Sequence, residues 1–210
     1  MTPASIEKDA QKVSPPEAAK PQAAQPKATK PPTNFARSVL VYAVCVLIAV
    51  ALAAIVRYFL VEPYRIPTGS MLPTIQLNDM VLANKLVYKI GVKPKYKEIV
   101  VFKDPTGEYP QLIKRVIATG GQTVNLSGGS VYVDGKKLDE PYTHGKLSAP
   151  LPGAPWITFP YKVPQGDIWV MGDNRTDSAD SRAFGAIPDS TVYGRAWWTY
   201  WPLSHFGALR

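Results

Sequence analysis

A run of nineteen residues without a charged side chain, from Ser38 to Val56, constrains this chain more than any other feature. A helix rises about 1.5 Å per residue, so the run is long enough to cross a hydrocarbon core of roughly 30 Å. It is apolar on every face, unlike most buried core helices, and it starts later than a cleavable signal sequence usually does. We therefore expect one retained transmembrane helix over residues 38–61, in which Arg57 can extend its charge to the interface.

The charges around this anchor predict its orientation. Within twenty positions, the far side offers Arg65 and the boundary residue Arg57, whereas the N-terminal side offers Lys20, Lys27, Lys30 and Arg37. The positive-inside rule then places the N-terminus in the cytoplasm and residues 62–210 on the exported side. Residues 1–37 are rich in Ala, Pro, Lys and Gln. Because they bring too little apolar surface to offset their ordering entropy, we expect a disordered cytoplasmic tail, with a partner-binding role left open.

Net charge and cysteine usage exclude several functional classes. The net charge of +8 divides into +3 for residues 1–37, +1 for Arg57 and +4 for residues 62–210. Such an even spread argues against a nucleic-acid module and fits contact with anionic lipid headgroups. The single cysteine, Cys45, lies inside the anchor, so neither an intramolecular disulfide nor a cysteine cluster for a metal is possible.

Beyond the anchor the pattern becomes extended. Short β-branched or aromatic segments alternate with Gly, Pro, Asn and Asp, which predicts a mainly β domain. Asp134-Gly135, between two such segments, predicts a tight hairpin. Residues 139–166 carry many Pro and Gly residues without periodicity, so we expect a long irregular connection with at most a short strand near Trp156–Phe159. The expected strands are residues 80–83, 99–102, 112–119, 123–126, 130–133, 168–171 and 191–197.

The first stretch that indicates chemistry is Glu62–Thr74, which contains Ser70. Pro67 and Pro73 stiffen the backbone on both sides of this serine, and Gly69 leaves room for another molecule to approach closely. Ser70 is therefore the first candidate nucleophile. A serine before a hydrophobic residue is common, so this stretch alone favours an ordinary serine.

A nucleophilic serine needs a base, and the usual one is histidine. The chain has two histidines, His144 and His205, and both are expected to be surface residues because of their irregular or terminal settings. Lys114 lies instead inside an apolar, strand-like run, where burial would lower the pKa of its ammonium group. Alternation along a strand places Lys114 and Arg115 on opposite faces, so one of them is expected to be exposed. A solvated lysine on an edge strand is the alternative.

A third stretch, Gly172–Arg182, is far more polar than the strand before it requires. It holds three aspartates, two arginines, two serines and an asparagine. Its carboxylates can pair with Arg175 and Arg182 to fix a loop, and a serine hydroxyl can hold a neutral amine. A solvent-exposed turn is the alternative.

Together, Ile66–Thr74, Lys114–Ile117, and Gly172–Arg175 with Ser178–Arg182 resemble the bacterial type I signal peptidases, Ser-Lys serine proteases of the S26 family, in this order behind a membrane anchor. The resemblance implies a catalytic domain of coiled antiparallel sheets, barrel-like in form. It also implies a membrane-bound endopeptidase of protein secretion that removes signal peptides from preproteins through an acyl-enzyme. It further implies a single-pass monomer of the bacterial cytoplasmic membrane without a cofactor.

The same resemblance assigns roles to individual residues. Ser70 would be the nucleophile and Lys114 the general base, while Thr68 would complete the oxyanion hole and Ser178 would orient the lysine. Asp180 and Arg182 would form a structural ion pair near the site, in a motif that also includes Asp173, Asn174 and Arg175. The chain departs from the family pattern at Asn78-Asp79 and Lys97-Glu98, where members often have Gly-Asp. The second departure leaves the local turn geometry open.

Two further sets of residues are expected to serve substrate and membrane. A shallow apolar pocket for small substrate residues would be lined by Ile66, Met71, Ile75, Leu112 and Ile113, with ordinary core packing as the alternative for several of them. Aromatic side chains favour the headgroup layer, although half of these could equally be core residues. They are Tyr58, Phe59, Trp197, Trp198, Tyr200 and Trp201.

Two other functions remain to be weighed. A self-cleaving Ser-Lys regulator shares the dyad and much of the β fold, but it would carry a DNA-binding helical domain and no membrane span. A membrane-anchored binding or scaffold domain would make Ser70 and Lys114 incidental. That reading requires full function after Ser70→Ala, whereas a protease would lose all of it.

Overall fold

The computed structural model describes residues 35–57 and 61–209. Helix α1, Phe35–Ile55, contains the stretch Arg37–Ile55, which is long and apolar enough to cross a membrane and has none of its surface buried inside the structure. Val61, expected as the last residue of the anchor, instead begins strand β1 and pairs with Asn84. Apart from residues 35–37, the predicted tail lies outside the described residues, as do Tyr58 and Phe59.

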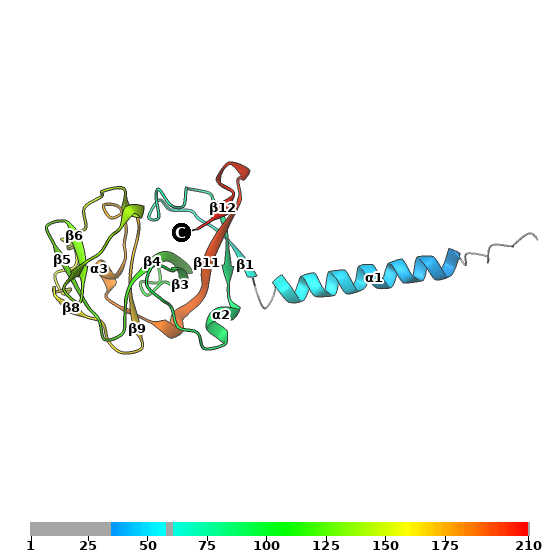
Figure 1. The fold of residues 1–210 in the computed structure, drawn as a ribbon, viewed down its shortest axis with the longest axis horizontal. Coiled ribbons are helices and arrows are strands. Elements are labelled where there is room, and N and C mark those ends of the chain that lie inside the picture. The colour runs from blue at the N-terminus through cyan, green and yellow to red at the C-terminus, as the bar shows by residue number, and fades with distance from the viewer. Residues whose placement is uncertain (1–34, 58–60, 210) are drawn as a thin grey trace, which may run out of the picture. The chain divides into compact units, whose positions relative to one another are not determined.

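Eight strands form one antiparallel sheet (Figure 1). Its order is β1, β2, β11, β3, β4, β9, β10, and β12 pairs with β11. Strand β4 therefore lies between two partners and has no free edge. The bounds are β1 Val61–Arg65, β2 Met80–Asn84, β3 Ile99–Lys103, β4 Gln111–Thr119, β9 Asp167–Met171, β10 Ile187–Pro188, β11 Val192–Trp201 and β12 Gly207–Ala208.

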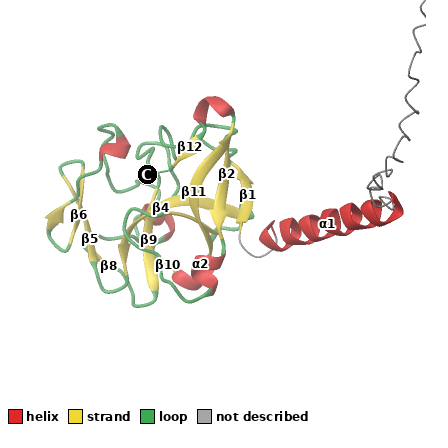
Figure 2. Cartoon of the chain, turned by 45° about the vertical axis from the view of Figure 1, so that its right-hand side comes forward, coloured by secondary structure: helices red, strands yellow, loops and turns green. Residues whose placement is uncertain are grey.

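Four strands form a smaller antiparallel sheet in the order β7, β6, β5, β8 (Figure 2). The hairpin predicted at Asp134-Gly135 is confirmed: it joins β6 to β7, and both residues have positive φ angles, 51° and 78°. The strand expected near Trp156–Phe159 is wrong, because the ring of Phe159 packs edge-on against Trp169 and the pairing with β5 falls later, on β8. The bounds are β5 Thr123–Ser127, β6 Ser130–Val133, β7 Lys136–Lys137 and β8 Tyr161–Lys162.

The larger sheet curls into a half-barrel, which confirms the expected fold class. Strand β11 shifts register against β3 between Val192 and Gly194, and against β2 between Ala196 and Trp198. Such bulges bend a strand and increase its twist. Short helices join the strands: α2 Leu86–Lys89, η2 Pro141–Thr143, α3 Ser181–Phe184, η3 Asp189–Thr191 and η4 Leu203–His205.

Buried apolar side chains gather in three clusters around these strands. One lies beneath the β1–β2 connection and includes Ile66, Val81 and Ile99. A second includes Val124 of the smaller sheet and Trp169 of β9, so it joins the two sheets. The third includes Val100, Phe102, Val116, Ile168, Val170, Ile187 and Val192. The connection that carries Ser70 therefore rests on a packed core.

Candidate active site

Ser70 lies in the connection between β1 and β2, and this connection is closed at its base. The Ile66 amide donates to Asp79 O at 2.9 Å, and the Asn78 amide donates to Ile66 O at 2.8 Å. Inside the loop the Leu72 amide donates to Gly69 O at 3.1 Å. These backbone bonds fix a turn whose serine side chain is buried.

Lys114 reaches this serine from the middle of β4. Its Nζ donates to Ser70 Oγ over 2.7 Å, and the residue is only 2% exposed. Burial lowers the pKa of the Lys114 ammonium group to about 8, against the opposing attraction of Asp180, Asp104 and Asp173. A lysine with such a pKa is partly neutral near physiological pH, as a general base must be.

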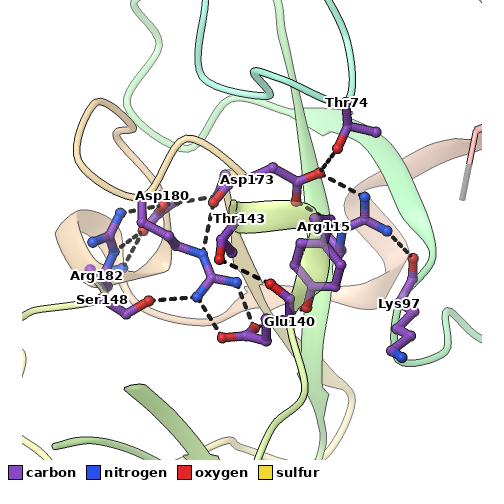
Figure 3. Close-up of polar contacts among 12 residues, drawn as sticks. Thr74, Lys97, Arg115, Glu140, Thr143, Ser148, Asp173, Asp180 and Arg182 are labelled. Carbon is purple, nitrogen blue, oxygen red and sulfur yellow. Dashed lines mark hydrogen bonds and ion pairs between the residues drawn. The ribbon is translucent and has the colours of Figure 1, made fainter. Parts of the chain in front are cut away.

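Arg115 is buried as well, so the expectation that one of the two neighbouring cations is exposed is wrong. Arg115 Nε and Nη2 bind the two Asp173 carboxylate oxygens at 2.8 and 2.7 Å, and Nη1 donates to Lys97 O at 2.9 Å (Figure 3). The guanidinium also lies 4.0 Å from the ring centre of Tyr142. Alternation along the strand predicted that one of the two side chains faces solvent. The Asp173 carboxylate and the Tyr142 ring take the place of solvent around Arg115.

The third polar stretch is buried apart from its tip, where Thr176, Asp177 and Ala179 are exposed. Asp180 binds Arg182 through two bonds of 2.9 Å, which places the expected ion pair, and it also accepts the Gly172 amide at 3.0 Å. Asp173 receives a third bond, from the Thr74 hydroxyl, so it links β4 to the connection that carries Ser70 (Figure 3). The loop therefore holds the nucleophile side and the lysine side of the site together.

Two residues of this loop lie directly against the nucleophile. The Asn174 amide donates to Ser70 O at 3.0 Å, and its side-chain Nδ2 donates to Gly69 O at 2.9 Å. Gly172 permits the close approach, because a Cβ there would overlap Ser70 O and Ser178 Oγ. The sequence marked Asn174 only as structural and did not single out Gly172.

The two expected auxiliary hydroxyls differ in their surroundings. Thr68 Oγ1 lies 3.5 Å from Ser70 Oγ, at the limit of a hydrogen bond. Ser178 Oγ is buried and has no hydrogen-bond partner among the described residues, so no bond joins it to Lys114. Both hydroxyls nevertheless lie near Ser70. The Thr68 hydroxyl is at the distance just given, and Ser178 Oγ and Ser70 O both lie next to the Cα of Gly172.

A cavity of about 200 Å³ adjoins Thr68. Three of the residues predicted to form a substrate pocket line it, namely Ile66, Leu112 and Ile113. Met71 and Ile75 do not, because both are fully buried in the cluster beneath the β1–β2 connection, where they are core residues. Several other lining residues were not predicted. Pro110, which marks the turn just before β4, was the one sequence feature that could have pointed to this segment. The lining residues that were not predicted include Tyr64, Val101, Tyr109, Pro110 and Gln111.

The histidines lie where they were expected. His144 is exposed, and His205 is partly exposed while its Nδ1 lies 2.7 Å from Asp79 Oδ1. Neither has a hydrogen bond to Ser70 in the part of the chain that the structure describes. In that part, no group of His, Cys, Asp and Glu side chains could hold a metal ion.

Both departures from the family pattern keep the turn geometry that glycine would provide. Asn78 and Lys97 adopt left-handed conformations, with φ angles of 65° and 73°. For a lysine this conformation costs roughly 1 to 2 kcal/mol. The same Lys97 carbonyl accepts Arg115 Nη1, so the turn serves the buried arginine.

Comparisons with known proteins agree with one another. A family model described as signal peptidase, peptidase S26, matches residues 39–201. A probable signal peptidase I-1 of Synechocystis is 38% identical over 170 residues, which cover 78% of this chain and 83% of that protein. A probable signal peptidase I-2 of the same organism is 40% identical over 168 residues, covering 77% and 72%. A signal peptidase I of Bacillus amyloliquefaciens is 36% identical over 165 residues, covering 75% and 83%.

Proposed function

Because this chain belongs to the signal peptidase family, peptidase S26, we propose that it is a signal peptidase I that removes N-terminal signal peptides from exported preproteins. The observation that carries the proposal is the 2.7 Å contact between Lys114 Nζ and Ser70 Oγ inside a buried site. A buried amine beside a hydroxyl is the arrangement that activates a serine without histidine.

The proposed reaction has two halves. Neutral Lys114 takes the Ser70 proton while Ser70 Oγ attacks the scissile carbonyl carbon, forming a tetrahedral intermediate. As the peptide C–N bond breaks, the Lys114 ammonium returns that proton to the leaving amine. Lys114 then takes a proton from a water that attacks the acyl ester, and it gives this proton back to Ser70 Oγ as the ester bond breaks.

The remaining roles follow from position. The oxyanion would be met by the Ser70 amide and the Thr68 hydroxyl, since Thr68 Oγ1 lies beside Ser70 Oγ. Ser178 would hold the neutral amine by accepting one of its N–H groups, because its buried hydroxyl has no hydrogen-bond partner among the described residues and lies next to the turn that carries Ser70. Ion pairs Asp173–Arg115 and Asp180–Arg182 would fix the geometry.

The substrate would enter as an extended chain. Its small residues before the cleavage point fit a cavity of about 200 Å³ with apolar walls at Ile66, Leu112 and Ile113. The apolar walls favour uncharged side chains near the scissile bond.

We place the catalytic domain at the exported surface of the cytoplasmic membrane, with α1 as its anchor and the N-terminus in the cytoplasm. Trp197 and Trp201 are 42% and 54% exposed, and Phe206 is exposed beside them in sequence. Trp198 packs its ring against Trp197 and Phe206. Indole rings with an apolar body and a polar tip favour the headgroup layer, so we assign Trp197 and Trp201 to it.

The test uses the full chain in detergent, with a preprotein that bears an Ala-x-Ala site. Cleavage is followed by mass spectrometry of both products, which locates the cut bond. We expect cleavage after that site by the wild type and by the exposed control Ser127→Ala, and none by Ser70→Ala. An intact preprotein, or equal cleavage by the two serine variants, would favour an anchored binding domain.

A further inference from the structure

The segment Glu140–Ser148, here called the strap, is predicted from sequence as part of an irregular connection, yet it is firmly held. Arg175 Nη1 and Nη2 bind the two Glu140 carboxylate oxygens at 2.8 and 2.6 Å, and Nη1 also binds Ser148 Oγ at 2.6 Å (Figure 3). The Ser148 amide donates to Gly129 O at 2.8 Å. Both ends of the strap are therefore bound to Arg175 of the polar loop. The Ser148 end is bound to the smaller sheet as well.

Between these ends the strap makes a contact that leads to the nucleophile. Lys146 Nζ donates to Asn174 Oδ1. An ammonium group only donates hydrogen bonds, so the Asn174 amide must turn its oxygen toward Lys146 and its Nδ2 toward Gly69 O. The 2.9 Å bond from Nδ2 to Gly69 O requires this same orientation.

The position of Gly69 O gives this contact a catalytic meaning. A peptide unit is planar, so the Gly69 carbonyl and the Ser70 amide are opposite ends of one rigid plane. A bond that fixes the direction of Gly69 O also fixes the direction of the Ser70 N–H, the proposed oxyanion donor. Glycine rotates more freely than other residues, and the Leu72 amide is the other donor to this carbonyl.

We propose that Lys146 is a positioning residue that acts through Asn174 to hold the Gly69–Ser70 peptide with its N–H toward the oxyanion. The inference rests on the proposed peptidase function. It assigns a role in the reaction to the strap, whose irregular sequence shows no catalytic pattern. The effect belongs to the transition state, because the Ser70 N–H binds a charge that is absent from the bound substrate.

The first test compares Lys146→Met with Lys146→Arg and with the exposed control Lys137→Met. Losing one hydrogen bond to a charged group corresponds to about a 10-fold loss or more. We expect Lys146→Met to lower kcat by about that factor with little change in KM or in the unfolding midpoint. Lys146→Arg should recover most of the rate. A wild-type kcat in Lys146→Met, or a loss that parallels a lower unfolding midpoint, would overturn the proposal.

The second test separates charge pairing from positioning. Asn174→Asp keeps an acceptor for Lys146 but cannot donate to Gly69 O. We expect it to lose roughly 100-fold in kcat, as when an oxyanion donor is lost. Adding Lys146→Met to Asn174→Ala should cause no further loss, because the two residues act in series. Near-normal activity of Asn174→Asp, or additive losses, would contradict the inference.

A third measurement does not depend on activity. In hydrogen exchange, the Leu72 amide should exchange faster in Lys146→Met and Asn174→Asp than in wild type or Lys137→Met, because its acceptor Gly69 O becomes mobile. Unchanged exchange would overturn the positioning role even if the wild type cleaves no preprotein. If Ser70→Ala cleaves the preprotein as the control does while the exchange result holds, the proposed function is rejected and the positioning contact is retained.

Discussion

The two faces of strand β4 bury neighbouring cations and treat them in opposite ways. On one face Lys114 has a serine hydroxyl as its partner, and burial lowers its pKa to about 8. On the other face Arg115 binds both oxygens of Asp173 and stays charged, because a guanidinium does not lose its proton in proteins. A buried cation thus becomes a base or a structural tie according to whether a carboxylate binds it directly.

The same difference reverses the effect of each residue on stability. Lys114 binds a proton in the unfolded chain up to its ordinary pKa of 10.5, but in the folded chain only up to about 8. Stability therefore rises with pH across that window, and below it the folded state bears the full penalty of roughly 3 kcal/mol. The buried ion pair of Arg115 with Asp173 instead stabilises the fold.

The substitution Lys114→Met is expected to have the largest effect and tests the contrast between the two faces most directly. We expect cleavage to fall by about 10⁴-fold or more, since the base is lost. At pH 7 the free energy of unfolding should nevertheless rise by roughly 1 to 3 kcal/mol, because methionine fills the site without an ammonium group to desolvate. Preprotein cleavage and denaturant unfolding measure the two effects. An active or destabilised variant would contradict the opposition between the faces.

On the other face, Arg115→Met should act in the opposite direction on stability. It leaves Asp173 as an unpaired buried carboxylate, so the free energy of unfolding should fall by roughly 3 to 5 kcal/mol. Changing Asp173→Leu in the same chain should recover much of that loss, because the stranded charge is removed as well. If Arg115→Met and the wild type unfold at the same denaturant concentration, the Arg115–Asp173 ion pair does not contribute to the free energy of unfolding.

Thr68→Val sharpens the description of the lysine face. It removes a hydroxyl beside Ser70 Oγ while keeping the shape of the side chain. If this hydroxyl meets the oxyanion, kcat should fall by roughly 10² to 10³-fold with KM nearly constant. Thr68→Ser serves as the control that retains a donor. A change in KM alone would assign Thr68 to the substrate cavity instead.

The pH dependence gives the smallest expected effect. The base must be neutral, so kcat/KM should fall tenfold per pH unit below the Lys114 pKa of about 8. Between pH 8 and pH 6 the neutral fraction of Lys114 falls from one half to about one hundredth, so the loss is about 50-fold. Arg115 adds no limb in this range because it stays charged. A flat profile over these pH values would exclude Lys114 as the base.

Local patterns in the sequence predicted the strands and the hairpin, because alternation and turn residues depend on near neighbours. The contact between Ser70 and Lys114 was also predicted, through three stretches that resemble a known family. The burial of Arg115 was not, because its partners Asp173 and Tyr142 come from segments 58 and 27 positions away. For Met71 and Ile75 the sequence left a pocket and a core both open, since apolar side chains give the same pattern in either place, and the structure places both in the core.

Three contacts that build the site join residues distant along the chain. Lys114 and Ser70 are 44 residues apart, Arg115 and Asp173 are 58 apart, and Asn174 and Gly69 are 105 apart. The chain must lose the conformational entropy of closing loops of this size before these contacts can stabilise the fold. During synthesis, the serine and the lysine are therefore both present before the loop of residues 172–182 that contacts Gly69, Ser70 and Arg115. The last part of the site to be translated is thus the part that joins its two sides.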